Sequence, residues 1–181
     1  MAFGATGTLW AEAREVRIAS HVSHFSPLHA QSELFAAEVE KRLPGQFEFK
    51  LYPGGQLGKE KDLMTNVQAG SIEMINVASG VMKLDKKLGV FDLPWLFDDR
   101  AHVRRAMAAG LEDAIRARVE EVGNVQVIGV YENGFRHVIN TQRAVAEPFD
   151  LEGLKIRIYP LSWRRLFPAF RIGVISAIAI Q

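Results

Sequence analysis

The sequence contains no cysteine, which excludes disulfide scaffolds, thiolate zinc sites and cysteine nucleophiles. It has no apolar run of about 18 residues, so we expect no segment that inserts into a membrane. The net charge is only +1, which gives no reason to expect a nucleic-acid partner. The chain has 181 residues, 48% hydrophobic and 24% charged, which is typical of one globular domain or two small ones.

Acidic residues are missing from one end of the chain. From residue 153 to residue 181 there are five basic residues and no Asp or Glu. Two interpretations stay open at this point. The stretch is a basic surface tail, or it is not the segment with which this fold was built.

The N-terminus ends in a pattern of small residues. Ala11, Glu12 and Ala13 form an A-x-A sequence directly before a charged, strand-like segment. Such a pattern is typical of the cleavage site of a secretory signal, although the usual basic start is missing. The alternatives are a signal remnant over residues 1–13 and a ragged terminus.

The first half of the chain alternates strand and helix patterns. Strands are predicted at residues 15–20, 47–51 and 72–78, and helices at residues 28–43 and 59–69. This β-α-β-α-β order predicts a parallel sheet and an α/β fold.

The second half has a less regular pattern. Two helices are predicted at residues 98–109 and 111–122, separated by Gly110. Strands are predicted at residues 125–130, 135–141 and 155–159, with a short capped turn at 148–153.

Local motifs for cofactor or metal chemistry are weak. Pro53 and Glu60 stand where a phosphate-binding loop needs Gly and Ser or Thr. His21, His24 and His29 are close in sequence, but strand-end and helix-start positions would not converge on a metal. We therefore predict no cofactor and no metal.

Two arginines lie within apolar strand patterns. Arg136 follows Phe135, and Arg157 stands between Ile156 and Ile158. A guanidinium in such a place needs a partner, and its planar fork matches a carboxylate. An internal salt bridge, an exposed strand face and a carboxylate ligand all remain open on the residues alone.

Five motifs in order give the chain a recognisable resemblance. Together they resemble the TRAP-type (tripartite ATP-independent periplasmic) solute receptors, closest to the dicarboxylate-type branch, over the N-terminal half of that family only. The motifs are LYPGGQLG at 51–58, QAGSIEM at 68–74, FDLPWLF at 91–97, ENGFRH at 132–137 and DLEGLKIR at 150–157.

The resemblance implies an exported, periplasmic receptor with two α/β lobes. It would bind an organic acid, such as a C4-dicarboxylate or a related carboxylate, close by hinge motion and deliver the ligand to the membrane subunits of a transporter. Residues 14–130 would form the first lobe and residues 131–159 the start of an incomplete second lobe.

The resemblance also assigns site residues. Arg157 would hold the carboxylate of the ligand, and Arg136 would lie near it. The remaining positions are placed more loosely, and they are His21 after the first strand, Glu60 after the QLG loop, and Asn76 and Ser79 at the end of the third strand.

The resemblance stops after Ile158. Residues 160–181 match none of the later family motifs, and the change falls where acids disappear. We expect an aberrant tail, from an out-of-frame reading or from a truncation. A half-cleft leaves its ligand in water, so we expect weak or absent binding by this chain.

Two alternatives accompany the receptor hypothesis. One is a remnant of such a receptor that binds nothing. The other is a small α/β enzyme that uses His21 or His137 with Glu60 as acid–base groups.

Overall fold

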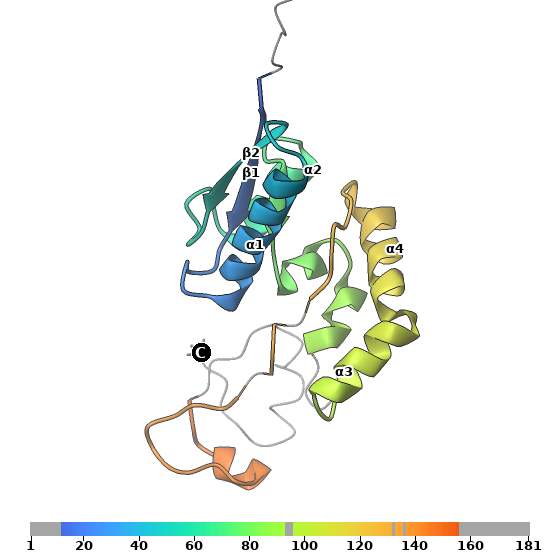
Figure 1. Cartoon of the computed structure of the whole chain (residues 1–181). Coiled ribbons are helices and arrows are strands. Elements are labelled where there is room, and N and C mark those ends of the chain that lie inside the picture. The colour runs from blue at the N-terminus through green and yellow to red at the C-terminus, as the bar shows by residue number, and fades with distance from the viewer. Residues whose placement is uncertain (1–11, 93–95, 132, 136, 156–181) are drawn as a thin grey trace, which may run out of the picture. The chain divides into compact units, whose positions relative to one another are not determined.

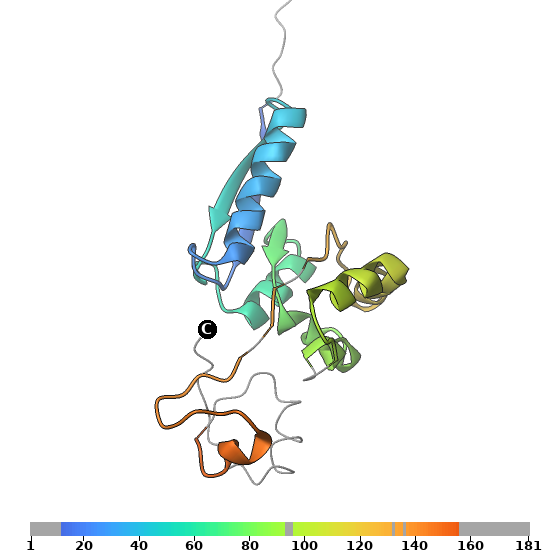
Figure 2. The same cartoon turned by 60° about the horizontal axis from the view of Figure 1, so that its bottom comes forward.

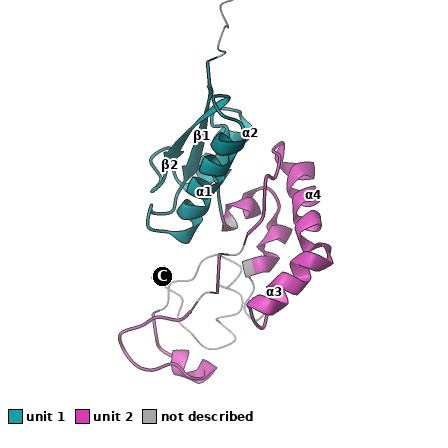
Figure 3. Cartoon of the chain, viewed as in Figure 1, with its two compact units in different colours: residues 1–77 teal, residues 78–181 magenta. Residues whose placement is uncertain are grey.

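The computed structural model describes residues 12–92, 96–131, 133–135 and 137–155. The chain forms two compact units, residues 1–77 and residues 78–181 (Figure 3). The predicted lobe boundary at residue 130 stays a prediction. The strand predicted at 155–159 lies almost wholly outside the described residues, as do the tail at 160–181 and most of the N-terminal segment 1–13.

A three-stranded parallel sheet organises the first unit. Its strands are β1 (Arg14–Ser20), β2 (Phe47–Tyr52) and β3 (Met74–Asn76), in the order β2-β1-β3. The helices α1 (Pro27–Arg42) and α2 (Glu60–Gln68) join successive strands (Figures 1 and 2). The predicted β-α-β-α-β order is confirmed, with element ends shifted by a residue or two and the third strand shortened.

The two helices cover opposite faces of the sheet. On one face, Val16 and Ile18 of β1 are buried, as are Leu28 and Ala36 of α1, and Phe35 meets Phe49 edge to face at 5.8 Å. On the other face, Ala19 clusters with Leu63 of α2 and with Ile72. Because side chains alternate along a strand, β1 divides its residues between the two helices.

Local interactions determine where α1 begins and how the chain turns after β2. Ser26 caps α1 by accepting a hydrogen bond from the Leu28 N–H at 3.3 Å, and Pro27 occupies the first turn. Gly54 and Gly55 follow β2 with φ of 67° and 74°, a left-handed conformation that glycine adopts without strain. The PGG turn thus lets the chain leave β2 sharply.

An ion pair extends the pairing of β1 with β3. The Arg17 guanidinium donates to both carboxylate oxygens of Glu73, from Nε at 2.9 Å and from Nη2 at 2.7 Å. The Arg17 N–H donates to the same carboxylate at 3.0 Å. Above all the side-chain hydrogen bond from Arg17 lowers the pKa of the Glu73 carboxyl to about 2.

This depressed pKa predicts an acid-sensitive contribution to stability. Since the pKa of Glu73 is about 2 in the folded chain and its ordinary value is 4.5, the contribution of Glu73 to stability is complete above about pH 4.5 and is lost as the pH falls toward 2. Glu73→Gln should therefore be less stable than the wild type at pH 7 and should lose less stability between pH 5 and about 2. Urea unfolding at stepped pH measures this, with Glu48→Gln as the control for one lost exposed charge. Parallel pH profiles for the wild type and Glu73→Gln would contradict it.

The second unit is mostly helical. It contains η1 (Ser79–Lys83), η2 (Lys86–Asp92), α3 (Arg100–Ala106), the π-helical turn η3 (Met107–Leu111), α4 (Glu112–Gly123) and η4 (Pro148–Leu151). Gly110 has φ of 102°, so the predicted interruption between the two helices is confirmed. Arg118 of α4 donates to Asp85 at 2.6 Å, and this contact joins α4 to the segment between η1 and η2. Arg118 also donates to Glu121 of its own helix at 2.7 Å.

The strands predicted at 125–130 and 135–141 are wrong for the residues that the structure describes there. None of these pairs with a neighbour, and Ile128, Val138 and Ile139 are all exposed. The alternating pattern detected apolar side chains, but a strand also needs a partner for its N–H and C=O groups. The described residues supply none.

Candidate functional site: a polar pocket at the carboxyl edge of the sheet

The loops that follow β1 and β2 meet at the carboxyl edge of the first unit's sheet. The Gly54 N–H donates to the Val22 carbonyl at 2.7 Å, and the Gly55 N–H donates to the Ser20 carbonyl at 2.9 Å. The chain then leaves β1 toward α1 and β2 toward α2, on opposite faces of the sheet. In open α/β sheets, ligands bind in the crevice that such diverging connections leave.

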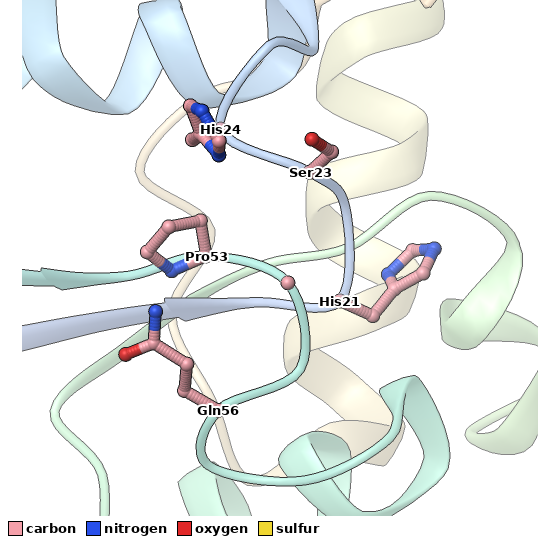
Figure 4. Close-up of a pocket in the computed structure, with 6 residues that line it drawn as sticks. His21, Ser23, His24, Pro53 and Gln56 are labelled. Atoms are coloured by element: carbon pink, nitrogen blue, oxygen red, sulfur yellow. The ribbon is translucent and has the colours of Figure 1, made fainter.

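A pocket of about 340 Å³ lies between these two loops (Figure 4). Figure 4 shows Ser23 and His24 on the loop after β1, and Pro53 and Gln56 on the loop after β2. The lining is polar for a small pocket, since four of its six residues carry hydrogen-bonding side chains. The six are His21, Ser23, His24, Pro53, Gly54 and Gln56.

His21 and Glu60, both predicted from the resemblance, are brought together. The His21 Nδ1 lies 3.8 Å from the Glu60 Oε1, which is ion-pair range but longer than a hydrogen bond. This Nδ1 is buried and has no hydrogen-bond partner among the described residues. The Glu60 side chain is 12% exposed and begins α2, where its charge complements the helix dipole.

Asn76 lies at the predicted end of the third strand, and its side chain forms hydrogen bonds within the fold. Its side chain is buried, and the amide Nδ2 donates to the Leu28 carbonyl at 2.6 Å and to the Ser32 hydroxyl at 3.1 Å. Both N–H groups of the amide are thus used to hold α1 against β3. The geometry gives Asn76 a structural role beside the edge.

This structural role predicts that the protein loses stability when the Asn76 amide is removed. Asn76→Ala should lower the free energy of unfolding by about 1–2 kcal/mol, because it removes the two buried hydrogen bonds that the Asn76 amide donates to α1. Urea unfolding followed by circular dichroism measures the loss, and Thr65→Ala, an exposed hydroxyl on α2, is the control. A variant as stable as the wild type would contradict the structural role.

The other predicted site residues lie in the second unit or outside the described residues. Ser79 begins η1 in the second unit, and its side chain is not among those described. Arg136 and Arg157 lie outside the described residues. His137, the other acid–base candidate, is exposed in the second unit.

Three lining residues were missed as ligand contacts from the sequence: Ser23, His24 and Gln56. His24 drew attention only as a metal candidate, and the described residues hold no group of three or more His, Cys, Asp or Glu that could bind an ion. The signal that could have found them is their place directly after two neighbouring parallel strands. Within the described part of the chain, no helix is long and apolar enough to span a membrane.

Comparisons with known proteins match most of the chain. The family model for bacterial extracellular solute-binding protein, family 7, matches residues 18–171, so the match runs past residue 160. A solute-binding protein of Verminephrobacter eiseniae is 36% identical over 69% of this chain and 37% of its own length. The 2,3-diketo-L-gulonate-binding periplasmic protein YiaO of Escherichia coli is 30% identical over 80% of this chain and 44% of its own.

Solved structures agree with these relatives. A TRAP periplasmic solute-binding protein of Pseudomonas aeruginosa with bound L-malate has a TM-score of 0.80 and 25% identity, over 92% of this chain and 57% of that chain. The chain therefore spans about half the length of the proteins it matches. The α/β fold of the periplasmic solute-binding type is confirmed, and the chain belongs to family 7 of the bacterial extracellular solute-binding proteins.

Proposed function

We propose that this chain is the substrate-binding portion of a periplasmic receptor of the TRAP type. It captures an organic acid by its carboxylate and presents it to the membrane subunits of a secondary transporter. The observation that carries the proposal is the polar pocket at the carboxyl edge of β1 and β2, in a chain of this family. Relatives named for 2,3-diketo-L-gulonate and solved with L-malate are in keeping with a carboxylate ligand.

We propose, as the resemblance implies, that Arg157 holds the carboxylate of the ligand in a bidentate pair and that Arg136 assists it. We propose separately that His21 and the loop residues after β1 and β2 are ligand contacts. We propose binding without turnover, in keeping with a family and relatives that are named for solute binding.

Ligand-observed NMR on the 181-residue chain tests the proposal, because saturation transfer detects weak binding. The panel includes L-malate, succinate, D-gluconate and D-galacturonate, with the uncharged D-glucitol as the control. We expect saturable binding of at least one acid, no binding of glucitol, and recovery of every acid unchanged. If no acid binds, the chain is a remnant without a site, and if an acid is converted, the enzyme alternative holds.

A further inference from the structure

Strand β2 forms an edge of the sheet in the first unit. Among the described residues it pairs with β1 and with no other strand. The Arg14 N–H donates to the Gln46 carbonyl at 2.9 Å, so the N–H of Phe47, in the same peptide unit, points away from β1. Since this direction alternates along a strand, the N–H groups of Phe49 and Leu51 point outward as well. An edge of this kind can pair with another chain.

A carboxylate from α1 occupies the centre of this edge. The Phe49 N–H donates to the Glu40 Oε1 at 3.2 Å, and Glu40 is an exposed residue near the end of α1. A charged side chain placed against a sheet edge is a common means of preventing edge-to-edge association. The contact therefore points to a strand partner whose approach Glu40 hinders.

The sequence of β2 is self-complementary when two copies run antiparallel. One register sets Phe49 opposite Phe49 of the second copy and Phe47 opposite Leu51. Glu48 then lies opposite Lys50, so that cross-strand neighbours are apolar with apolar or acid with base, which are favourable pairs. The outward N–H and C=O groups of the two strands also face one another in this register, as an antiparallel ladder requires.

Other registers lose this match. A shift by one residue sets apolar side chains opposite charged ones and outward backbone groups opposite inward ones. A shift by two residues sets Glu48 opposite Glu48, or Lys50 opposite Lys50, and like charges directly opposite are unfavourable. The sequence thus favours one symmetric register centred on Phe49.

We infer that the β2 edge is a docking surface for a second copy of this chain, and that Glu40 limits the pairing. The two copies are related by a two-fold axis through the Phe49 pair, so each contributes the same residues. On docking, each Phe49 N–H exchanges the Glu40 carboxylate for a carbonyl of the other strand. The two Glu40 carboxylates lie near the axis, where their like charges oppose the association.

Sedimentation velocity of the full 181-residue chain over a concentration series tests this inference. Glu40→Ala should form dimers at a concentration at least about tenfold lower than the wild type, because docking no longer breaks two hydrogen bonds or brings two carboxylates together. Glu38→Ala is the matched control, since it removes a carboxylate of α1 that accepts from Arg42, and it should associate like the wild type. A Glu40→Ala chain that stays as monomeric as the wild type overturns the inference.

A charge exchange within β2 tests the register. In the Glu40→Ala background, Glu48→Lys sets like charges opposite one another and should raise the dissociation constant of the dimer by about threefold or more. Addition of Lys50→Glu restores opposite charges and should recover the dimer, with the melting temperature as the check on folding because Lys50 also pairs with Glu15. Dimers that are indifferent to both changes form through another surface and overturn the assignment to β2.

Amide hydrogen exchange locates the contact directly. The N–H groups of Phe47 and Leu51 should exchange more slowly at concentrations where Glu40→Ala is dimeric, because they become hydrogen-bonded to the second strand. Amides of α3 should exchange at a rate that does not depend on concentration. Unchanged exchange at Phe47 and Leu51 in a dimeric sample would exclude this edge as the interface.

Discussion

Leu63→Ala is expected to lower the free energy of unfolding of the first unit by about 2–5 kcal/mol. Leu63 is fully buried, and it fills the space between α2 and the sheet with Ala19 and Ile72. Removal of its side chain loses apolar burial and leaves a cavity that neighbours on a parallel sheet cannot close by moving. The loss should appear as a lower urea midpoint in circular dichroism.

Leu34→Ala is the matched control for this prediction. Leu34 has the same side chain but is 71% exposed on α1, so its removal should change the free energy of unfolding by less than about 0.5 kcal/mol. If the two variants unfold at the same urea concentration, the α2 face of the sheet is not the core of this unit.

Arg157→Ala is expected to weaken organic-acid binding by about tenfold or more. A hydrogen bond to a charged group contributes about 1.5–3 kcal/mol, and about 1.4 kcal/mol corresponds to a factor of ten in affinity. Arg157→Lys should bind with intermediate affinity, because an ammonium keeps the charge but cannot form the planar bidentate pair. The affinities are measured by NMR titration with the acid that the wild type binds best.

Arg164→Ala controls for a general loss of positive charge near the same end of the chain. It should bind like the wild type, because the proposal gives Arg164 no contact with the ligand. An equal loss of affinity in the two alanine variants would indicate diffuse electrostatic attraction. It would contradict the proposal that Arg157 contacts the carboxylate of the ligand.

The sequence predicted the first unit well because local patterns and tertiary structure agree there. Alternating residues at 15–20 and 47–51 find partners in one sheet, and Ser26-Pro27 and Gly70 mark helix ends that the fold keeps. The same alternation predicted strands at 125–130 and 135–141 that the described residues do not form. A pattern of apolar residues does not show whether a neighbouring strand is present.

The site was predicted only in part, for a similar reason. His21 and Glu60 came from the resemblance, and the structure places them 3.8 Å apart. Asn76 stands at a predicted strand end, but only the three-dimensional packing reveals that its amide holds α1. Ser23 belongs to none of the five motifs, and Gln56 lies within LYPGGQLG without having been assigned to the site. The two residues come to line one pocket because backbone hydrogen bonds tie their loops together.

The central claim is that the carboxyl edge of β1 and β2 faces an organic acid, and amide shift mapping tests it most directly. The ¹H–¹⁵N spectrum of the 181-residue chain is recorded as the best-binding acid of the panel is added to saturation. We predict saturable shifts for residues 20–24 and 54–60, with α3 and α4 unaffected. Saturable shifts confined to the second unit, or no shift at any position, would contradict the account.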